Sequence, residues 1–383
     1  MSSQHRHHIL ATATGIAAAW VFAVSPRVPF MRRAQSASRI PRLPHKDPAP
    51  LVPNTPFAHR GLHDAGSGYP SDDGEQMSHQ LHTYYTLTRQ LARKAGYGKG
   101  APKGASIAPE NSLAAFEAAC RGGYGIELDL QMTRDGHVVV FHDDTLQRAT
   151  RVAGSVADYT YEQLCHLPLF STPLTGGSAG FASGDSVEAL PYDEVATRLA
   201  SWQSHIPLFS DVLKLVNGRV PLIVEYKARG AHVPPDVLEK GDQLLRSYAG
   251  SYVVESFDPL AMGWYRVHNP RVIRGQLACQ QALSTLIHDA PSLATRVTDS
   301  LGGAALADCI SRPDFLAMDW HMWDSTTAAI ARDMGAQSVA WTVRSMEEAL
   351  QCVDRFDRII FEGFIPQLGV FGRGSVSHAA SNQ

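Results

Sequence analysis

Two acidic side chains stand out within one apolar run near the middle of the chain. Glu127 and Asp129 are separated by a single residue, and on a β-strand this spacing places both side chains on the same face. An Asp135-Gly136 pair then separates this run from a second apolar run that ends at His142, which is a strong signal for a β-hairpin. Because burying two carboxylates side by side is costly unless a cation compensates them, the pattern indicates a site.

Other apolar runs also end in polar residues. His59 and Arg60 end the first strand-like run, and Glu225 and Lys227 stand two residues apart at the end of another. In β/α barrels the catalytic residues come from the C-terminal ends of several strands, so we expect these side chains to converge. The alternative is that Glu225 and Lys227 simply pair with each other.

The residue types predict a reaction on a phosphate ester. Three converging carboxylates suit a hard divalent cation, Mg²⁺ or Ca²⁺. Arg60 and Lys227 supply positive charge for an anionic substrate, and His59 and His142 could serve as general base and general acid near neutral pH. Together they predict metal-assisted cleavage of a phosphodiester.

The chain that must position these residues alternates between strand-like and helical patterns. We predict strands at Thr55–His59, Gly125–Leu130, Val138–Phe141, Pro221–Tyr226, Tyr252–Ser256, Val272–Leu277, Phe315–Asp319, Ser338–Val343 and Arg358–Phe361. We predict helices at Asn111–Arg121, Phe209–Val216, Pro235–Tyr248, Pro259–Val267, Thr326–Met334 and Ser345–Asp354. The alternation predicts an α/β fold, a (β/α)₈ TIM barrel, with Val138–Phe141 as the extra hairpin strand. A doubly wound open sheet is the alternative.

We expect three regions along the chain. Residues 1–54 form an N-terminal segment with a Pro-rich linker, residues 55–366 form the barrel, and residues 367–383 form a polar tail. Two inserts interrupt the barrel, at residues 62–108, with a helical middle at 79–94, and at residues 171–190. Inserts of this length are usually lids, binding loops or disordered segments.

The N-terminal segment has three interpretations. Residues 9–24 carry no charge, and the apolar stretch could extend to residue 30. As an uncleaved anchor it would associate with a membrane, and the arginines that follow it would keep the barrel on the cytoplasmic side. As a signal peptide it would be removed during export. The third interpretation is a disordered tail.

Composition excludes some classes of function. The 383 residues carry a formal net charge of −3, which gives no indication of a nucleic-acid partner. The five cysteines are odd in number and form no C-x-x-C pair, so neither a disulfide framework nor a zinc site is expected.

Taken together, these residues resemble the glycerophosphodiester phosphodiesterase family, whose fold is a TIM barrel. The resemblance rests on motifs that run from about residue 55 to residue 364: His59-Arg60-Gly61, Pro109-Glu110-Asn111-Ser112, Leu113-Ala114-Ala115-Phe116, Glu127-x-Asp129, Thr133-Arg134-Asp135-Gly136, His142-Asp143, Glu225-Tyr226-Lys227, Ser256-Phe257 and Trp341-Thr342-Val343.

The resemblance implies a role for each matching position. It implies that the divalent metal is bound by Glu127, Asp129 and Glu225, with Glu110 as a further ligand or as support beside them. It also implies His59 and His142 as the acid/base pair, Arg60 and Lys227 beside the phosphate, and Phe257, Trp341 and Arg344 as candidates for a substrate pocket. The implied reaction is hydrolysis of a glycerophosphodiester to sn-glycerol 3-phosphate and an alcohol.

The chain departs from the family pattern in three places. Residues 62–108 replace a short loop, Arg344 replaces an Asn, and Phe361-Glu362 replaces Thr-Asp. We expect none of these to touch the metal and acid/base residues, and we expect Arg344 to favour a more anionic headgroup.

Two other functions compete with glycerophosphodiester hydrolysis. One is a lysophospholipase D-like activity on membrane lysolipids, which the N-terminal apolar run would favour. The other is a catalytically silent barrel that binds a partner, against which the retention of both histidines and all three carboxylates argues.

Overall fold

The structure is a computed structural model, and it describes residues 52–64, 78–101, 106–169, 189–198, 204–230, 232–278, 310–325, 328 and 336–368. The predicted N-terminal apolar segment, residues 171–188 of the second insert, most of the helix predicted at 326–334 and residues 369–383 of the tail lie outside the described residues. None of the helices described is both long enough and apolar enough to cross a bilayer.

The described strands form one sheet. They are β1 (Phe57–Ala58), β2 (Gly125–Met132), β3 (Val138–Val140), β4 (Leu222–Tyr226), β5 (Tyr252–Ser256), β6 (Arg274–Ala278), β7 (Phe315–Asp319), β8 (Gln337–Val343) and β9 (Arg358–Phe361). Their hydrogen-bonded order is β1-β9-β8-β7-β6-β5-β4-β2-β3, and β1 also pairs with β2. The order therefore closes into a ring of eight strands, with β3 attached to β2 in antiparallel fashion. This is the topology of the predicted (β/α)₈ barrel, and the doubly wound alternative is wrong.

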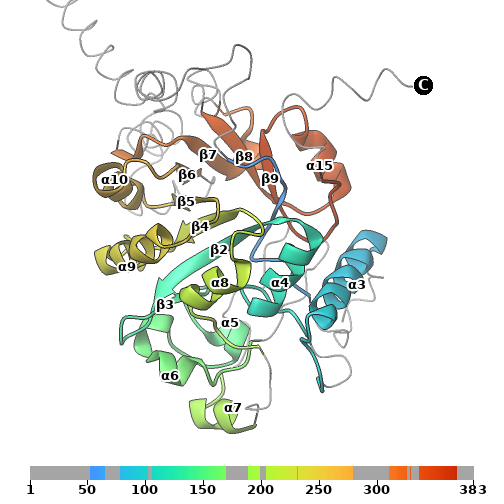
Figure 1. The fold of residues 1–383 in the computed structure, drawn as a ribbon, viewed down its shortest axis with the longest axis vertical. Coiled ribbons are helices and arrows are strands. Elements are labelled where there is room, and N and C mark those ends of the chain that lie inside the picture. Colours follow the sequence, from blue (N-terminus) through green and yellow to red (C-terminus); the bar gives the residue numbers. More distant parts are fainter. Residues whose placement is uncertain are drawn as a thin grey trace, which may run out of the picture. The chain divides into compact units, whose positions relative to one another are not determined.

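Helices follow most of the strands (Figure 1). They are α3 (His79–Lys94), α4 (Leu113–Gly122), α5 (Gln147–Thr150), α6 (Tyr161–Leu164), α7 (Tyr192–Arg198), α8 (Phe209–Val216), α9 (Pro235–Arg246), α10 (Pro259–His268) and α15 (Met346–Cys352), with 3₁₀ turns η1 (Val156–Asp158) and η4 (Trp320–Met322). Helix α3 has the bounds predicted for the middle of the first insert, and α8 has its predicted bounds as well.

Two compact units can be distinguished along the chain. One contains residues 1–52 and 255–339, and the other contains residues 53–254 and 340–383. In the first unit, α10 buries Met262 and Tyr265, and β7 begins with the fully buried Phe315. In the second unit α4 packs against β2 and α8, and α3 packs against α4. All residues of the candidate site described below, except Phe257, belong to the second unit.

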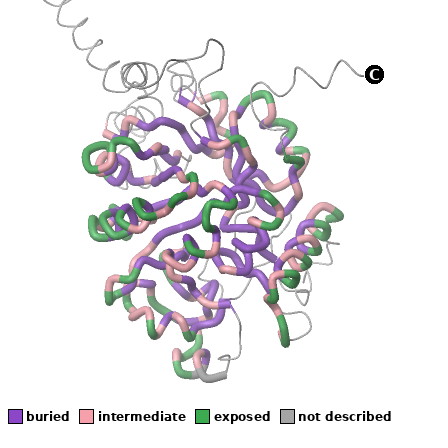
Figure 2. Tube along the Cα trace, viewed as in Figure 1, coloured by how far each residue is buried: buried purple, intermediate pink, exposed green. Residues whose placement is uncertain are grey.

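Burial runs along the central strands of the second unit, as Figure 2 shows for β2 and β4. The first six residues of β2 are buried, including Glu127 and Asp129. Residues Leu130 and Val140 pair across the predicted hairpin. In the parallel pairing with β4, Asp129 lies opposite Glu225. This register, which depends on two strands far apart in the sequence, determines where the acidic side chains meet.

The turn after β1 packs closely on α4. The side chain of Ser112 caps this helix by accepting a hydrogen bond from the backbone N–H of Ala115, as expected for an N-cap serine. Gly61 has φ +83°, and a Cβ on it would lie 2.9 Å from the carbonyl carbon of Ala115. Because only glycine tolerates both the dihedral and the approach, Gly61 lets the His59-Arg60 turn lie directly against the helix.

Candidate active site

Three carboxylates from neighbouring strands meet in one cluster. Glu127 and Asp129 lie on β2, and Glu225 lies on β4. All three are buried, and one oxygen from each lies within 4.8 Å of the others. Within the described part of the chain, this is the one group of at least three His, Cys, Asp or Glu side chains close enough to share a metal ion. The structure therefore brings together the three residues that the sequence grouped as metal ligands.

Two cationic side chains contact this cluster. Lys227 Nζ lies 3.0 Å from Asp129 Oδ1 and 2.9 Å from Glu225 Oε1, so the pairing of Glu225 with Lys227 does occur. The backbone N–H of Arg60 donates to Glu127 Oε2 at 3.0 Å, and Arg60 Nε lies 3.8 Å from Asp129 Oδ2. Although burial opposes ionisation, Lys227 and other cations hold the pKa of Asp129 below its ordinary value. Burial and the neighbouring Asp129 raise the pKa of Glu225.

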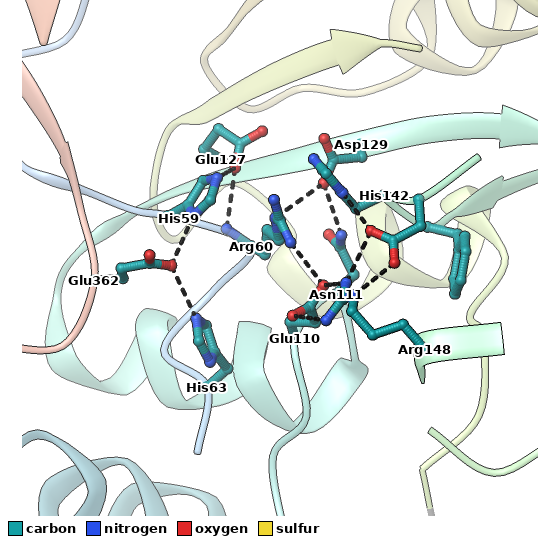
Figure 3. A network of polar contacts seen from close by, with 12 residues as sticks. His59, Arg60, His63, Glu110, Asn111, Glu127, Asp129, His142, Arg148 and Glu362 are labelled. Carbon is teal, nitrogen blue, oxygen red and sulfur yellow. Dashed lines mark hydrogen bonds and ion pairs between the residues drawn. The ribbon is translucent and has the colours of Figure 1, made fainter. Parts of the chain in front are cut away.

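Asn111 fixes the other oxygen of Asp129. Its Nδ2 donates to Asp129 Oδ2 at 2.7 Å, as Figure 3 shows. Asn111 and Arg60 both have a left-handed φ of 55°, and the Asn111 N–H donates to the Arg60 carbonyl at 3.0 Å. A left-handed conformation at a non-glycine residue costs about 1–3 kcal/mol and persists only where its surroundings enforce it. The two residues are held by each other, and both direct their side chains at Asp129.

Glu110 bridges two buried guanidinium groups. Arg60 Nη1 donates to Glu110 Oε1 at 2.8 Å, and Arg148 donates to both oxygens, at 2.6 and 3.0 Å. The two arginines outweigh the effect of burial and hold the pKa of Glu110 well below its ordinary value. Glu110 is not part of the carboxylate cluster. Of the two roles that the resemblance implied, the contacts favour support over direct metal ligation.

His142 is oriented by the residue that follows it. Its Nδ1 lies 2.6 Å from Asp143 Oδ1, and Arg148 donates to both oxygens of Asp143, at 2.5 and 2.9 Å. Despite burial, His142 and Arg148 lower the pKa of Asp143 to about 2. Because an ionised carboxylate only accepts hydrogen bonds, the His142 proton lies on Nδ1. Burial, Arg60 and Lys227 lower the pKa of His142 to about 4, so its Nε2 carries a lone pair.

His59 is oriented by Glu362, a carboxylate that comes from the C-terminal stretch of the second unit. Its Nδ1 lies 2.8 Å from Glu362 Oε2, and its Nε2 lies 4.0 Å from Glu127 Oε2. Burial and Arg60 outweigh the effect of Glu362 and lower the pKa of His59. The expectation that the Phe361-Glu362 departure does not touch the acid/base residues is therefore wrong. The reason is that β9 hydrogen-bonds beside β1, which places the end of one strand next to the end of the other.

Arg344 also binds Glu362. Its Nε donates to Glu362 Oε1 at 2.7 Å, and its backbone N–H donates to Glu348 Oε2 at 2.6 Å. The positive charge of Arg344 is therefore balanced by a buried carboxylate, and this weakens the argument that Arg344 attracts an anionic headgroup. Trp341 lies on β8 within the second unit, whereas Phe257 follows β5 in the first unit. The pocket roles of these three residues stay predictions.

Sequence reasoning gave no role to five residues that contact the site. Asn111 and Asp143 stood inside recognised motifs, so their polar side chains at turns were an available signal. Glu362 was visible only as a departure from the motif. Arg148 lies on the one-turn helix α5, and His63 lies 3.5 Å from Glu362 at the start of the insert. No local pattern marks either of these two.

Comparison with protein families identifies a match over most of the chain. Residues 96–365 match the glycerophosphoryl diester phosphodiesterase family. The matched region contains all three clustered carboxylates and His142, and it begins after the His59-Arg60 turn, which the first insert separates from the rest of the motifs.

Individual relatives match over shorter stretches. A glycerophosphodiester phosphodiesterase of Bacillus altitudinis is 35% identical over 124 residues, which is 32% of this chain and 41% of the relative. One from Caldanaerobacter subterraneus is 53% identical over 57 residues, which is 15% of this chain and 24% of the relative. The chain thus spans less than two thirds of these relatives.

Solved structures with a similar course of the chain include two phosphodiesterases. The Oleispira antarctica phosphodiesterase in complex with the product sn-glycerol-3-phosphate has a TM-score of 0.47 and 18% identity, covering 66% of this chain and 87% of that one. The glycerophosphodiester phosphodiesterase of Thermotoga maritima has a TM-score of 0.45 and 17% identity, covering 80% of this chain and 92% of that one.

Proposed function

The chain belongs to the glycerophosphoryl diester phosphodiesterase family, and on that premise we propose that it hydrolyses glycerophosphodiesters to sn-glycerol 3-phosphate and an alcohol. The observation that carries the proposal is the arrangement of the second unit. Its carboxylate cluster is contacted by Arg60 and Lys227, and the two imidazoles near it, His59 and His142, each have a carboxylate on Nδ1.

A divalent cation fits the carboxylate cluster. The ligands would be Glu127, Asp129 and Glu225, whose oxygens lie within 4.8 Å of one another and which are all buried. An all-oxygen donor set of this kind suits Mg²⁺ or Ca²⁺, whereas a zinc site more often uses Cys or several His. When bound, the cation would polarise the phosphoryl oxygens and offset their charge.

The two cationic side chains support binding of the phosphodiester anion. Arg60 is buried and Lys227 is partly buried beside the cluster, and the neighbouring carboxylates hold the pKa of both above their ordinary values. Both therefore stay charged throughout the physiological range. A guanidinium and an ammonium at the same place provide fixed donors for phosphate oxygens.

The imidazoles supply proton transfer. With the proton on Nδ1, each ring presents Nε2 as a base that can take a proton from the attacking water. The other ring must then deliver a proton to the leaving alkoxide. A bound phosphodiester adds a negative charge beside both rings, which favours the protonated form of an imidazole. His59 and His142 have the same arrangement, a carboxylate on Nδ1 and a free lone pair on Nε2, so either ring can act as the base with the other as the acid.

A substrate panel tests the proposal. Glycerophosphocholine, glycerophosphoethanolamine and lysophosphatidylcholine are each supplied with a divalent cation and, in parallel, with EDTA. Release of sn-glycerol 3-phosphate is followed by a coupled dehydrogenase. We expect release from the glycerophosphodiesters that stops with EDTA. Turnover of the lysolipid alone would replace the proposal with a lysophospholipase D-like activity, and turnover that survives chelation would remove the metal from it.

A further inference from the structure

Glu362 is a buried carboxylate with three partners, and the family motif has a shorter acid at its position. It follows β9 and is fully inaccessible to solvent. Its Oε1 accepts from Arg344 Nε at 2.7 Å. Its Oε2 accepts from His59 Nδ1 at 2.8 Å and lies 3.5 Å from His63 Nε2, two contacts that Figure 3 shows. His59, His63 and Arg344 outweigh burial and hold the pKa of Glu362 well below its ordinary value. An ionised side chain so placed can only accept hydrogen bonds.

This acceptor determines the tautomer of His59. Since Glu362 cannot donate, the ring proton of neutral His59 lies on Nδ1, and Nε2 is left with its lone pair on the side where Glu127 Oε2 lies, 4.0 Å away. A neutral histidine exposed to water has no such fixed choice of tautomer or ring orientation. Glu362 therefore holds His59 in the tautomer whose Nε2 lone pair faces the carboxylate cluster.

The first insert reaches the same carboxylate through His63. The backbone N–H of His63 donates to the hydroxyl of Tyr84 on α3 at 3.3 Å, and the two rings meet edge to face with centroids 6.0 Å apart. Tyr84 is fully buried, and burial raises its pKa well above the ordinary value, so the hydroxyl keeps its proton. Helix α3 thus fixes the backbone that carries His63 against Glu362.

Asp64 attaches the insert at both of its ends. It directly follows His63, and its carboxylate accepts from Arg89 Nε on α3 at 2.6 Å. The same carboxylate accepts from Ser106 Oγ at 2.8 Å and from the backbone N–H of Ala108 at 2.7 Å, where the insert ends. The position of His63 is therefore tied to the folded insert and is not that of a free loop.

We propose that Glu362 is the positioning residue for His59, and that the insert sets the position of Glu362 through Tyr84 and His63. The insert then helps to position the side chains that transfer protons, in addition to any role as a lid over the site. This inference rests on the proposed hydrolysis for its kinetic test, and a second test below needs no turnover.

A double-mutant cycle separates positioning from structural support. In Glu362→Gln the amide oxygen stays on Arg344, so the NH₂ group faces His59 Nδ1 and favours the wrong tautomer. We expect kcat to fall by about 10²- to 10⁴-fold with little change in KM, the range for loss of a general acid or base. In a His59→Ala background the same change should lower kcat by less than about threefold, because the two residues act as one unit. Equal factors in both backgrounds would overturn the proposal.

Two further variants extend the test, and Tyr84→Phe keeps it decisive if Glu362→Gln does not fold. Glu362→Asp retains the charge and should exceed Glu362→Gln in kcat by about tenfold or more.

Tyr84→Phe removes only the hydroxyl, and it should lower kcat about threefold to tenfold in the wild type and have no effect in His59→Ala. Tyr85→Phe, the same change one residue along α3, measures the cost of losing a hydroxyl from this helix. A Tyr84→Phe effect that persists in His59→Ala or is matched by Tyr85→Phe would overturn the role of the insert.

The tautomer can be read without substrate. Long-range ¹H–¹⁵N NMR on histidine-labelled protein, with His59 assigned by its loss in His59→Ala, should show the proton on Nδ1 in the wild type and on Nε2 in Glu362→Gln. An unchanged tautomer would overturn the proposal. Because this measurement requires no hydrolysis, failure of the proposed function leaves its result standing, and the two failures are distinguishable.

Discussion

Asp129 and Glu225 are register partners on the parallel strands β2 and β4, and the ammonium group of Lys227 lies 3.0 Å from one and 2.9 Å from the other. Two buried carboxylates that share one ammonium group repel each other, because the single positive charge of that group balances only one of the two negative charges. The raised pKa of Glu225, caused by burial and by Asp129, reflects the remaining imbalance.

Removing the charge of Glu225 should abolish the response to metal without loss of stability. In EDTA, Glu225→Gln relieves the repulsion with Asp129, so we expect its melting temperature to equal or exceed that of the wild type. A cation that binds only the folded state stabilises it by about 2.7 kcal/mol at a hundred times its Kd. Mg²⁺ or Ca²⁺ should therefore raise the melting temperature of the wild type and leave that of Glu225→Gln unchanged. Asp211→Asn, at an exposed ion pair on α8, should respond like the wild type. An undiminished rise in Glu225→Gln would remove this residue from the metal site.

Both imidazoles should be required for turnover. We expect His59→Ala and His142→Ala each to lower kcat by about 10²- to 10⁴-fold on glycerophosphocholine, because each removes a group that transfers a proton. The matched control is His137→Ala, which changes an exposed histidine on the same hairpin as His142 and should leave kcat within about twofold. Full activity in either of the first two variants would contradict the acid/base assignment.

Glu110 should contribute to stability and leave metal binding intact. Glu110→Gln leaves the buried guanidinium groups of Arg60 and Arg148 without their shared counter-charge, and removing one partner of a buried ion pair typically costs about 3–5 kcal/mol. Urea unfolding in EDTA should show this loss, while the rise in melting temperature with Mg²⁺ or Ca²⁺ should persist. The opposite pattern, unchanged stability and no metal response, would identify Glu110 as a ligand.

Glu117 lies on α4 and is not part of the carboxylate cluster, and it should contribute to stability in a pH-dependent way. It accepts from Arg121 Nε at 2.7 Å and from Arg219 of the loop after α8. Hydrogen bonds from Arg219 and Arg121 outweigh burial and lower its pKa below 4.5. Because the folded-state pKa is below that of the unfolded chain, the contribution is complete above about pH 4.5 and is lost as the pH falls through the lowered value.

The test is urea unfolding of Glu117→Gln at several pH values. At pH 7 the variant should be less stable by about 1 kcal/mol, since both arginines are partly exposed. The difference from the wild type should shrink as the pH falls below 4.5. A difference that stays constant down to pH 3 would mean that the charge of Glu117 is not what stabilises the fold.

Local patterns were enough to predict most elements of the fold. The two-residue spacing of Glu127 and Asp129 and the Asp135-Gly136 turn predicted β2, β3 and the shared face of the two carboxylates, and the structure confirms this. These features depend on strand pleat and turn chemistry, which act between near neighbours. The helical spacing of the first insert likewise predicted α3 with its observed bounds.

Contacts between distant segments could not be predicted in the same way. The sequence separation between His59 and Glu362 is 303 residues, and their approach depends on the pairing of β1 with β9. Arg148 reaches Glu110 and Asp143 from a single helical turn, where no periodicity marks a buried residue. Such side chains become visible only when the strand order and register are known.

The site draws on two separate stretches of the chain, residues 53–254 and residues after 340. The first stretch carries all three clustered carboxylates, both imidazoles, Arg60 and Lys227, and the second carries Glu362. A gene product that ends before residue 340 would therefore keep all the metal and histidine motifs but would lack Glu362, the acid beside His59. When homologous fragments are sorted into active and inactive enzymes, the presence of β9 and the acid after it is therefore a better criterion than the presence of those motifs.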